Sequence, residues 1–350
     1  MDIEFHYYMT YLIAARAGFT PAQATIIGTA AQGVDDNHII YTIAGDGDPY
    51  QNYISQTMDI LKPAKRLNRI YPIYHFIPGV KGAESARRKD KAEDDWITTP
   101  DSPLARKMID AALASGDLHR IGVSAHGYVD TWAHQNFVGH RSDLNYMVSS
   151  GVAGRLLCIG HGDAGHHPDK PALIWTDARL AADTVDNRHR FLDAAEALYR
   201  RFAGYVRPTA PSAQLDAEVA SLRTDLDADI GPTDPGSVDA FQLDRIVRYR
   251  ARATTAPYGG VPMPDYDAFG WFNVAVKEDG SELKHIYNRL LDFAANYVDQ
   301  PAPIACHWDD QVNYRTTDWY LFSEAIKEHQ NECWSFLEDA KISGLDAPEM

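Results

Sequence analysis

The chain has 350 residues, and 33 lysines and arginines against 49 aspartates and glutamates give a formal net charge of −16 at pH 7. This length predicts about two domains, and the proportions of hydrophobic and charged residues are those of an ordinary globular protein, which excludes a disordered or fibrous chain. The acidic charge disfavours the binding of long nucleic acid. Because no apolar run could span a bilayer and the opening MDIEFHYY carries no secretion signal, we expect a cytoplasmic protein, or one exported by a route without a signal peptide.

Two helices are expected at the start of the chain. Apolar residues recur at helical spacing over residues 5–17, and Gly18 can end this helix. Thr20 is a good N-cap and Pro21 suits the first helical position, so a second helix should run toward Asp36.

The pattern changes between His38 and about Gly79. The runs IIYTI and IYPIYHFI are rich in Ile and Tyr and predict short strands or extended loops. The following stretch KGAESARRKDKAEDDW has mixed charges and no apolar face, which indicates an exposed connection.

Helical patterns dominate the rest of the chain. They cover Pro103 to Ser115, Leu118 to Phe137, Ala181 to Tyr205, a segment between breaks at 207–211 and 231–236, Glu282 to Tyr297, and Thr317 to Lys341. We therefore predict a mainly α fold, a multi-helix bundle-like domain around a metal cluster, with a small irregular or β insertion near residues 39–80. Residues 1–205 would form a metal-binding catalytic core and residues 206–350 a helical extension that completes the core or walls the cleft, unless the whole chain is one continuous domain.

Histidines supply the main functional signal. Seven of the fourteen lie between His119 and His167, an enrichment that a solvated surface does not need. The three cysteines are far apart and never form C-x-x-C, which argues against a disulfide framework or a cysteine zinc cluster.

The segment LHRIGVSAHGYVDTWAHQNF places three potential metal ligands on one helix face. An α-helix turns about 100° per residue, so Asp130 and His134 lie about 40° and 80° round the helix from His126. The stripe is otherwise small or apolar and should face the interior, where unpaired polar groups of this kind cost several kcal/mol. A divalent cation would satisfy all three groups, and zinc suits a mixture of imidazole nitrogen and carboxylate oxygen. Two alternatives remain for these three residues: another divalent metal, or a purely structural ion pair.

Further potential ligands come from other parts of the chain. Each of them, taken alone, could equally be structural: His75 as a core histidine, for example, or the adjacent acids at the end of the second helix as solvated groups. The set comprises Asp2 and His6 on the first helix, Asp35 and Asp36, His75, and His161, Asp163, His166, His167 and Asp169 from the loop GHGDAGHHPD.

The order of these residues resembles the helical zinc-dependent phospholipase C and single-strand nuclease superfamily. There an early histidine, an aspartate, a histidine, a helical His-x-x-x-Asp and later histidines build a three-zinc cluster. The opening DIEFHYYMTYLIAARAGF and the segment HGYVDTWAHQNF also resemble an uncharacterised bacterial family with the same helical motif, which implies no activity.

The first resemblance implies a ligand set for each of three zinc ions: His75, His126, Asp130 and one of Asp35 or Asp36; Asp130 and His6; and His134, His161 and either Asp163 or His166. The superfamily also uses a processed N-terminal amine as a ligand. Here Asp2 should protect Met1 from trimming, and Asp2 is the expected replacement for that amine. Gly165 stands where an acid usually follows the last histidine, so two metal ions are as well supported as three.

The chemistry expected from such a site is metal-dependent hydrolysis of a phosphodiester. Two or three zinc ions about 3.5–4 Å apart can hold the substrate and activate water as a metal-bound hydroxide for in-line attack. Whichever of Asp35 and Asp36 does not bind metal is the candidate general base. A lipid head group, a small phosphodiester or a single-stranded nucleic acid would fit this chemistry, and a phospholipase without a signal peptide would need export or an inhibitor protein.

The sequence lacks the motifs of several other enzyme classes. The chain has no adjacent His-Asp dyad, no H-E-x-x-H, no Walker phosphate loop and no G-x-S-x-G, and its G-x-G-x-x-G at Gly160 is followed by His166, His167 and Pro168 where a helix should begin. The alternative from another class is a non-catalytic helical protein whose metal or ion-pair cluster is structural and which acts through a partner. A structural site would be closed and four-coordinate, whereas a catalytic site keeps an open position.

Overall fold

The computed structural model describes the chain except residues 46, 58–63, 148–157, 236–240, 278–302 and 343–350. The described part is mainly helical, as predicted. Its helices are α1 (Thr10–Ala17), α2 (Pro21–Asp36), α3 (Ala64–Tyr74), α4 (Pro103–Ser115), α5 (Leu118–Ala133), α7 (Asn187–Val206), α8 (Ser212–Ile230), α9 (Gln242–Ala253), α10 (Gly270–Ala275) and α12 (Asp318–Asp339), with a π-helix η1 (Glu4–Met9) before α1. The strands are β1 (Tyr41–Ala44), β2 (Tyr50–Gln51), β3 (Ile174–Thr176), β4 (Thr184–Asp186), β5 (Val276–Lys277) and β6 (Ile304–Trp308). Short 3₁₀ helices are η2 (Glu84–Ala86), η3 (Asp143–Asn145), η5 (Gly162–Ala164), η6 (His167–Asp169), η7 (Ala256–Tyr258) and η8 (Tyr314–Thr316).

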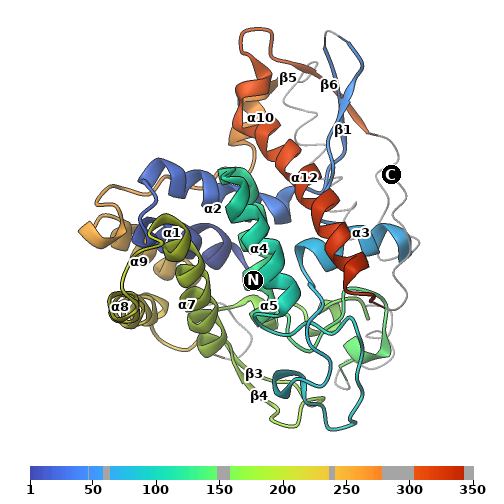
Figure 1. Cartoon of the computed structure of the whole chain (residues 1–350), viewed down its shortest axis with the longest axis vertical. Coiled ribbons are helices and arrows are strands. Elements are labelled where there is room, and N and C mark those ends of the chain that lie inside the picture. Colours follow the sequence, from blue (N-terminus) through green and yellow to red (C-terminus); the bar gives the residue numbers. More distant parts are fainter. Residues whose placement is uncertain (46, 58–63, 148–157, 236–240, 278–302, 343–350) are drawn as a thin grey trace.

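Helix α5 is the central element of the fold. It packs against α2, α3, α4, α7 and α12, and the start of the chain lies beside it (Figure 1). All of its residues from His119 to Ala133 are buried, as expected of a helix that is covered on every side. None of the helices in the described ranges is both long and apolar enough to cross a membrane.

Two glycines allow neighbouring helices to approach α5 closely. A Cβ at Gly122 would lie 2.4 Å from the carbonyl oxygen of Ile27 on α2, and a Cβ at Gly127 would lie 2.9 Å from that of Tyr74 on α3. Only glycine leaves room for backbone at these distances. Asp35 near the end of α2 and His75, the residue after α3, lie within 3.6 Å and 3.1 Å of His126 on α5.

The first two helices form where the sequence predicts them. Gly18 ends α1 with φ of 113°, a left-handed conformation that glycine adopts readily. The side chain of Thr20 accepts a hydrogen bond from Gln23 N, and the Gln23 side chain accepts one from Thr20 N, which is a complete capping box at the start of α2. The part of the first helix that precedes α1 differs from the prediction, because Glu4–Met9 is a π-helix.

The prediction of a strand or extended loop at IYPIYHFI is wrong. This run forms the second half of α3 and the turn after it, with Pro72 inside the helix. Ile70, Ile73 and Tyr74 are all buried, and their spacing is that of one helix face. Packing of this face against α5 and α12 overrides the strand preference of Ile and Tyr.

The β structure is not confined to residues 39–80. The strands form one sheet of order β2-β1-β6-β5 and a separate hairpin of β3 and β4. In the larger sheet, β1 pairs in parallel with β6, so that residues 41–44 lie beside residues 304–307. The hairpin occupies the beginning of the segment predicted as one long helix from Ala181, and α7 therefore begins only at Asn187.

The remaining helical predictions have mixed outcomes. Three of them are confirmed by α4, α8 and α12. The helix predicted from Leu118 to Phe137 ends at Ala133. The helix predicted from Glu282 to Tyr297 lies outside the described residues, and α9 and α10 were not predicted.

A histidine joins the beginnings of α5 and α12. His119 Nε2 lies 3.0 Å from Asp318 Oδ1, and His119 Nδ1 lies 3.5 Å from Asp117 Oδ1. Burial lowers the pKa of His119, but the hydrogen bonds to these two carboxylates outweigh it and raise the pKa above its ordinary value.

We expect His119 to make the stability of the protein depend on pH. A histidine whose folded-state pKa is raised stabilises the fold fully below its unfolded pKa of about 6.5, and this contribution is lost as the pH rises through the folded-state pKa. His119→Asn should lower the free energy of unfolding by about 1 kcal/mol at pH 5.5, the scale of a partly exposed ion pair, and by less at pH 9. Urea unfolding of the two proteins at both pH values tests this, and a difference independent of pH would contradict it.

Candidate metal centre

Histidine and aspartate side chains from several segments between His6 and Asp169 meet beside α5. They form three groups, and in each group the potential ligand atoms all lie within 4.8 Å of one another. We name them the His6 group (His6, His126, Asp130), the His75 group (Asp35, His75, His126) and the His161 group (His134, His161, Asp169). His126 belongs to two groups, and Asp130 Oδ2 lies 3.5 Å from His134 Nδ1 of the third, so the three groups form one continuous centre.

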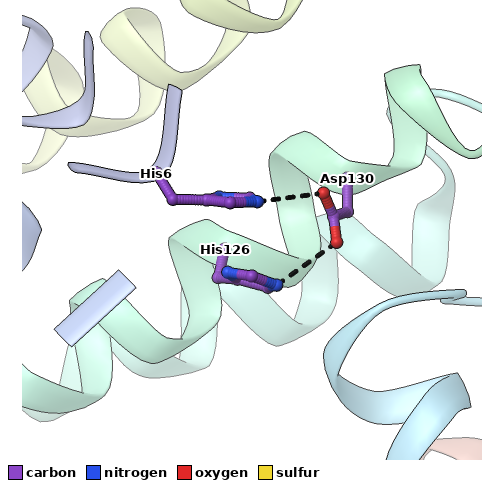
Figure 2. Close-up of side chains that lie close together, drawn as sticks. All are labelled: His6, His126 and Asp130. Atoms are coloured by element: carbon purple, nitrogen blue, oxygen red, sulfur yellow. Dashed lines mark ion pairs between the residues drawn. The ribbon is translucent and has the colours of Figure 1, made fainter. Parts of the chain in front are cut away.

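Asp130 lies in the middle of this centre. Figure 2 shows the imidazoles of His6 and His126 directed at its carboxylate from η1 and α5. His6 Nε2 is 3.3 Å from Asp130 Oδ1, and His126 Nε2 is 3.3 Å from Oδ2 (Figure 2). The two rings stack with their centroids 3.8 Å apart. Oδ2 also lies 3.5 Å from Nδ1 of both His75 and His134.

The His75 group is built where α2 and α3 end. Asp35 Oδ1 lies 3.6 Å from His126 Nε2 and 3.8 Å from His75 Nδ1. The Asp35 side chain is 27% exposed, whereas the other members of this group are buried. Solvent therefore reaches the centre at Asp35.

The His161 group is built by the end of α5 and the loop around η5 and η6. Asp169 Oδ1 lies 3.3 Å from His134 Nε2, and Asp169 Oδ2 lies 3.6 Å from His161 Nε2. The ring of Phe76 stacks on His134 with the centroids 4.6 Å apart, which fixes that imidazole in place.

A ring nitrogen lies beside a backbone carbonyl in five of the histidines. In His6 this nitrogen is Nε2, which also faces Asp130, and the carbonyl is that of Met1. The other four histidines are oriented differently. His75 Nε2 and His126 Nδ1 lie 2.9 Å and 2.8 Å from the carbonyl oxygens of Ser55 and Ala31. In the same way, Nδ1 of His134 and of His161 lie 2.8 Å and 2.7 Å from carbonyl oxygens. Because a carbonyl only accepts, each of these nitrogens carries the proton, and the other nitrogen of each ring faces the centre. Histidines that bind metals are held in this way.

This orientation requires a positive charge between His75 and His126. Their inward nitrogens, Nδ1 and Nε2, are 3.1 Å apart. Two neutral rings would direct two lone pairs at each other, so a proton or a metal cation has to lie between them. In addition, Asp130 Oδ2 is buried without a hydrogen-bond partner in the described part of the chain. A buried group of this kind is costly unless an ion satisfies it.

The nitrogen of Met1 lies inside the centre. It donates a hydrogen bond to Asp130 and lies 3.5 Å from Asp169 Oδ1. The Met1 carbonyl oxygen is 3.0 Å from His6 Nε2. Burial lowers the pKa of this amine, but the nearby carboxylates of Asp130, Asp169 and Asp35 outweigh it and raise the pKa to about 10. The ammonium group therefore supplies positive charge between the His6 and His161 groups.

Burial and neighbouring charges shift the pKa values of the other residues in the metal centre. Burial, together with the charges of His126 and the Met1 ammonium, lowers the pKa of His6 to about 4. Burial also lowers the pKa of His126, but Asp35 and Asp130 outweigh it and raise the pKa. Burial raises the pKa of Asp130, yet the surrounding imidazoles and the ammonium hold it well below its ordinary value. The carboxylates of the centre are thus ionised and ready to bind a cation.

The structure brings together seven of the predicted residues: His6, Asp35, His75, His126, Asp130, His134 and His161. Four others are placed differently. The Asp2 carboxylate accepts hydrogen bonds from Glu4 N and from the Gln242 side chain, and Asp36 accepts them from Tyr266 and Gln32. Asp163 accepts one from Met147 N, and His166, with its side chain 86% exposed, lies 3.5 Å from Asp169 at the edge of the centre.

Two participants were not assigned a role from the sequence. The sequence predicts Asp163 or His166 as the ligand beside His134 and His161, whereas the structure places Asp169 there. The sequence also predicts Asp2 in place of the N-terminal amine, whereas the Met1 nitrogen itself lies at Asp130. No spacing rule could have distinguished the two loop acids, because the path of the loop between His161 and Asp169 decides which carboxylate faces α5.

Fold and geometry together define a mainly α-helical protein with three adjoining groups of potential metal ligands. A model for a family of unknown function (DUF6765) matches residues 1–337, and the chain belongs to this family. No curated protein and no solved structure matches the chain. The resemblance to the zinc-dependent phospholipase C and nuclease superfamily therefore stays a prediction from the order of the residues.

Proposed function

We propose that the protein is a metal-dependent hydrolase that uses two or three zinc ions to cleave a phosphodiester. The observation that carries this proposal is the orientation of the four histidines. Each donates an N–H to a backbone carbonyl and turns its other nitrogen toward a carboxylate of the same centre. This arrangement favours a cluster of cations over a single ion pair.

The donor atoms favour zinc. Each group combines imidazole nitrogens with carboxylate oxygen, whereas magnesium and calcium prefer oxygen ligands alone. When bound, zinc ions polarise a phosphodiester, lower the pKa of a bound water and stabilise the leaving oxygen. The residues of the chain would hold these ions and orient the substrate beside them.

A pocket with many aromatic side chains lies at the end of α2, the helix that carries Asp35. It is lined by Asp36, the residue after Asp35, together with Tyr266, Trp271, Trp319 and other residues of α10 and α12. The Tyr266 hydroxyl hydrogen-bonds to Asp36, whose pKa is raised by burial. We propose that this pocket receives the organic part of the substrate and that Asp36 is a candidate general base.

The pocket also favours a small substrate. It includes two carboxylates, those of Asp36 and Asp267, and no lysine or arginine is among the residues that line it. A polynucleotide would bring further phosphates to a surface that cannot pair with them. A small phosphodiester or a lipid head group is therefore proposed ahead of a single-stranded nucleic acid.

The alternative function is a non-catalytic one with a closed structural cluster. The burial of His6, His126 and Asp130 favours it, because a structural site excludes solvent. The exposed fractions of the Asp35 and His161 side chains, 27% and 20%, favour the hydrolase, since they leave two edges of the centre open.

Hydrolysis of bis(p-nitrophenyl) phosphate tests the proposal. We expect turnover by the zinc-loaded protein and none after treatment with a chelator, with recovery when zinc is restored. A single-stranded oligonucleotide should be cleaved much more slowly than the small diester. A protein that binds zinc in stoichiometric amount but cleaves neither substrate would favour the structural alternative.

A further inference from the structure

Helix α9 holds the segment that carries His6. Gln242 Nε2 donates to Asp2 Oδ2 over 3.3 Å, and the Arg245 guanidinium donates to both carboxylate oxygens of Glu4 over 2.8–3.1 Å. The ring of Tyr249 lies against that of Tyr8, with the centroids 6.4 Å apart. Residues 242, 245 and 249 share one helix face, so α9 contacts the N-terminal segment along its length.

Arg245 also reaches the other side of the centre. Its Nη1 donates to both oxygens of Asp234 at 3.1 Å, and Asp234 N donates to the carbonyl oxygen of Ala172 over 3.0 Å. Ala172 follows Asp169 by three residues. One guanidinium therefore connects the segment of His6 with the loop of Asp169.

This contact is buried and geometrically demanding. The side chains of Arg245, Glu4 and Asp234 are all 0% exposed. A planar guanidinium can bind two carboxylates at once, each through paired hydrogen bonds, whereas a lysine ammonium carries the same charge without this fork. The Nε and Nη2 atoms of Arg245 form such a fork with Glu4, and Nη1 approaches both oxygens of Asp234. Because this contact is buried, we expect it to fix the separation of the two segments more firmly than an exposed ion pair would.

We propose that Arg245 is a positioning residue of the metal centre, which sets the distance between His6 and Asp169 and thereby the metal affinity of the His6 and His161 groups. The inference rests on the proposed metal binding. It gives α9 a specific part in the site, although none of the described residues after 206 belongs to the three groups. The His75 group is different, because its members come from α2, the end of α3 and α5, none of which contacts Arg245 in the hydrogen bonds described above.

Cobalt(II) titration of the metal-free protein tests this inference, with visible absorption as the readout of coordination. In Arg245→Lys we expect binding at the His6 and His161 groups to weaken about 10-fold to 100-fold, the usual effect of disturbing residues behind metal ligands. Binding at the His75 group should be unchanged, and Asp35→Asn identifies the share of the spectrum that this group contributes. Arg248→Lys is the matched control, since Arg248 lies on the same helix and donates to the carbonyl oxygens of Asp229 and Ile230.

Each outcome decides the inference. Selective weakening in Arg245→Lys, with normal binding in Arg248→Lys, supports it. If all groups weaken equally, or none weakens, Arg245 has only a general structural role and the inference is wrong while metal binding stands. A wild-type protein that binds no cobalt overturns the proposed function and this inference together. Should Arg245→Lys not fold, as judged by circular dichroism, Glu4→Gln keeps the shape of the contact, and the same selective weakening is expected.

Discussion

Replacing Asp130 by asparagine is expected to abolish most metal binding and to reduce phosphodiester hydrolysis by about 100-fold or more, since losses of this size already follow from changes behind metal ligands. The physical reason is the position of this carboxylate. Its Oδ1 faces His6 and the Met1 nitrogen, and its Oδ2 faces His126, so both oxygens are used. Asparagine keeps the shape but removes the charge and turns an N–H donor toward one of these sides. Metal content by mass spectrometry and initial rates measure the effect.

Asp163→Asn is the matched control for Asp130→Asn. Asp163 accepts a hydrogen bond from Met147 N and lies outside the three groups, so its replacement should leave the metal content unchanged. Asp169→Asn, in contrast, should lose the metal of the His161 group. Full zinc content in Asp130→Asn, or equal losses in Asp163→Asn and Asp169→Asn, would contradict the assignment of ligands.

Removal of zinc is expected to lower the free energy of unfolding more than the His119 substitution described above. A ligand that binds only the folded protein stabilises it by about 4 kcal/mol per site when its concentration is about 1,000 times the dissociation constant. Without the ion, the inward nitrogens of His75 and His126 need a proton between them, and the Asp130 carboxylate relies on its contact with the Met1 ammonium. Thermal unfolding should therefore shift to higher temperature as zinc is added to chelator-treated protein.

Two controls make this thermal measurement specific. Magnesium at the same concentration should have a much smaller effect, because it prefers oxygen ligands. Asp130→Asn should respond little to zinc. An unfolding temperature that is independent of zinc in the wild-type protein would show that the folded state has no zinc site.

The helix at the centre of the protein could be predicted because its signal is local. The regular rotation of an α-helix fixes the relative directions of His126, Asp130 and His134, whatever surrounds them. Capping by Thr20 and the left-handed turn at Gly18 are local as well: α1 ends at Gly18 and α2 begins after Thr20, as predicted.

Features that depend on tertiary contacts could not be predicted in the same way. Residues 70–74 have strand preferences but form part of α3, since packing against α5 and α12 decides their conformation. The parallel pairing of β1 with β6 joins segments far apart in the sequence, for which no periodicity gives a signal. The choice of Asp169 over Asp163 depends on the fold of one loop, and the contact of Arg245 with Glu4 connects opposite ends of the chain.

Anomalous scattering at the zinc edge, from crystals grown with zinc, is the most direct test of the metal centre. We expect peaks among the imidazoles of His6, His75, His126, His134 and His161 and the carboxylates of Asp35, Asp130 and Asp169. The absence of any peak there, with the histidines bonded only to neighbouring side chains, would contradict the proposal and leave a helical protein with a buried ion-pair cluster.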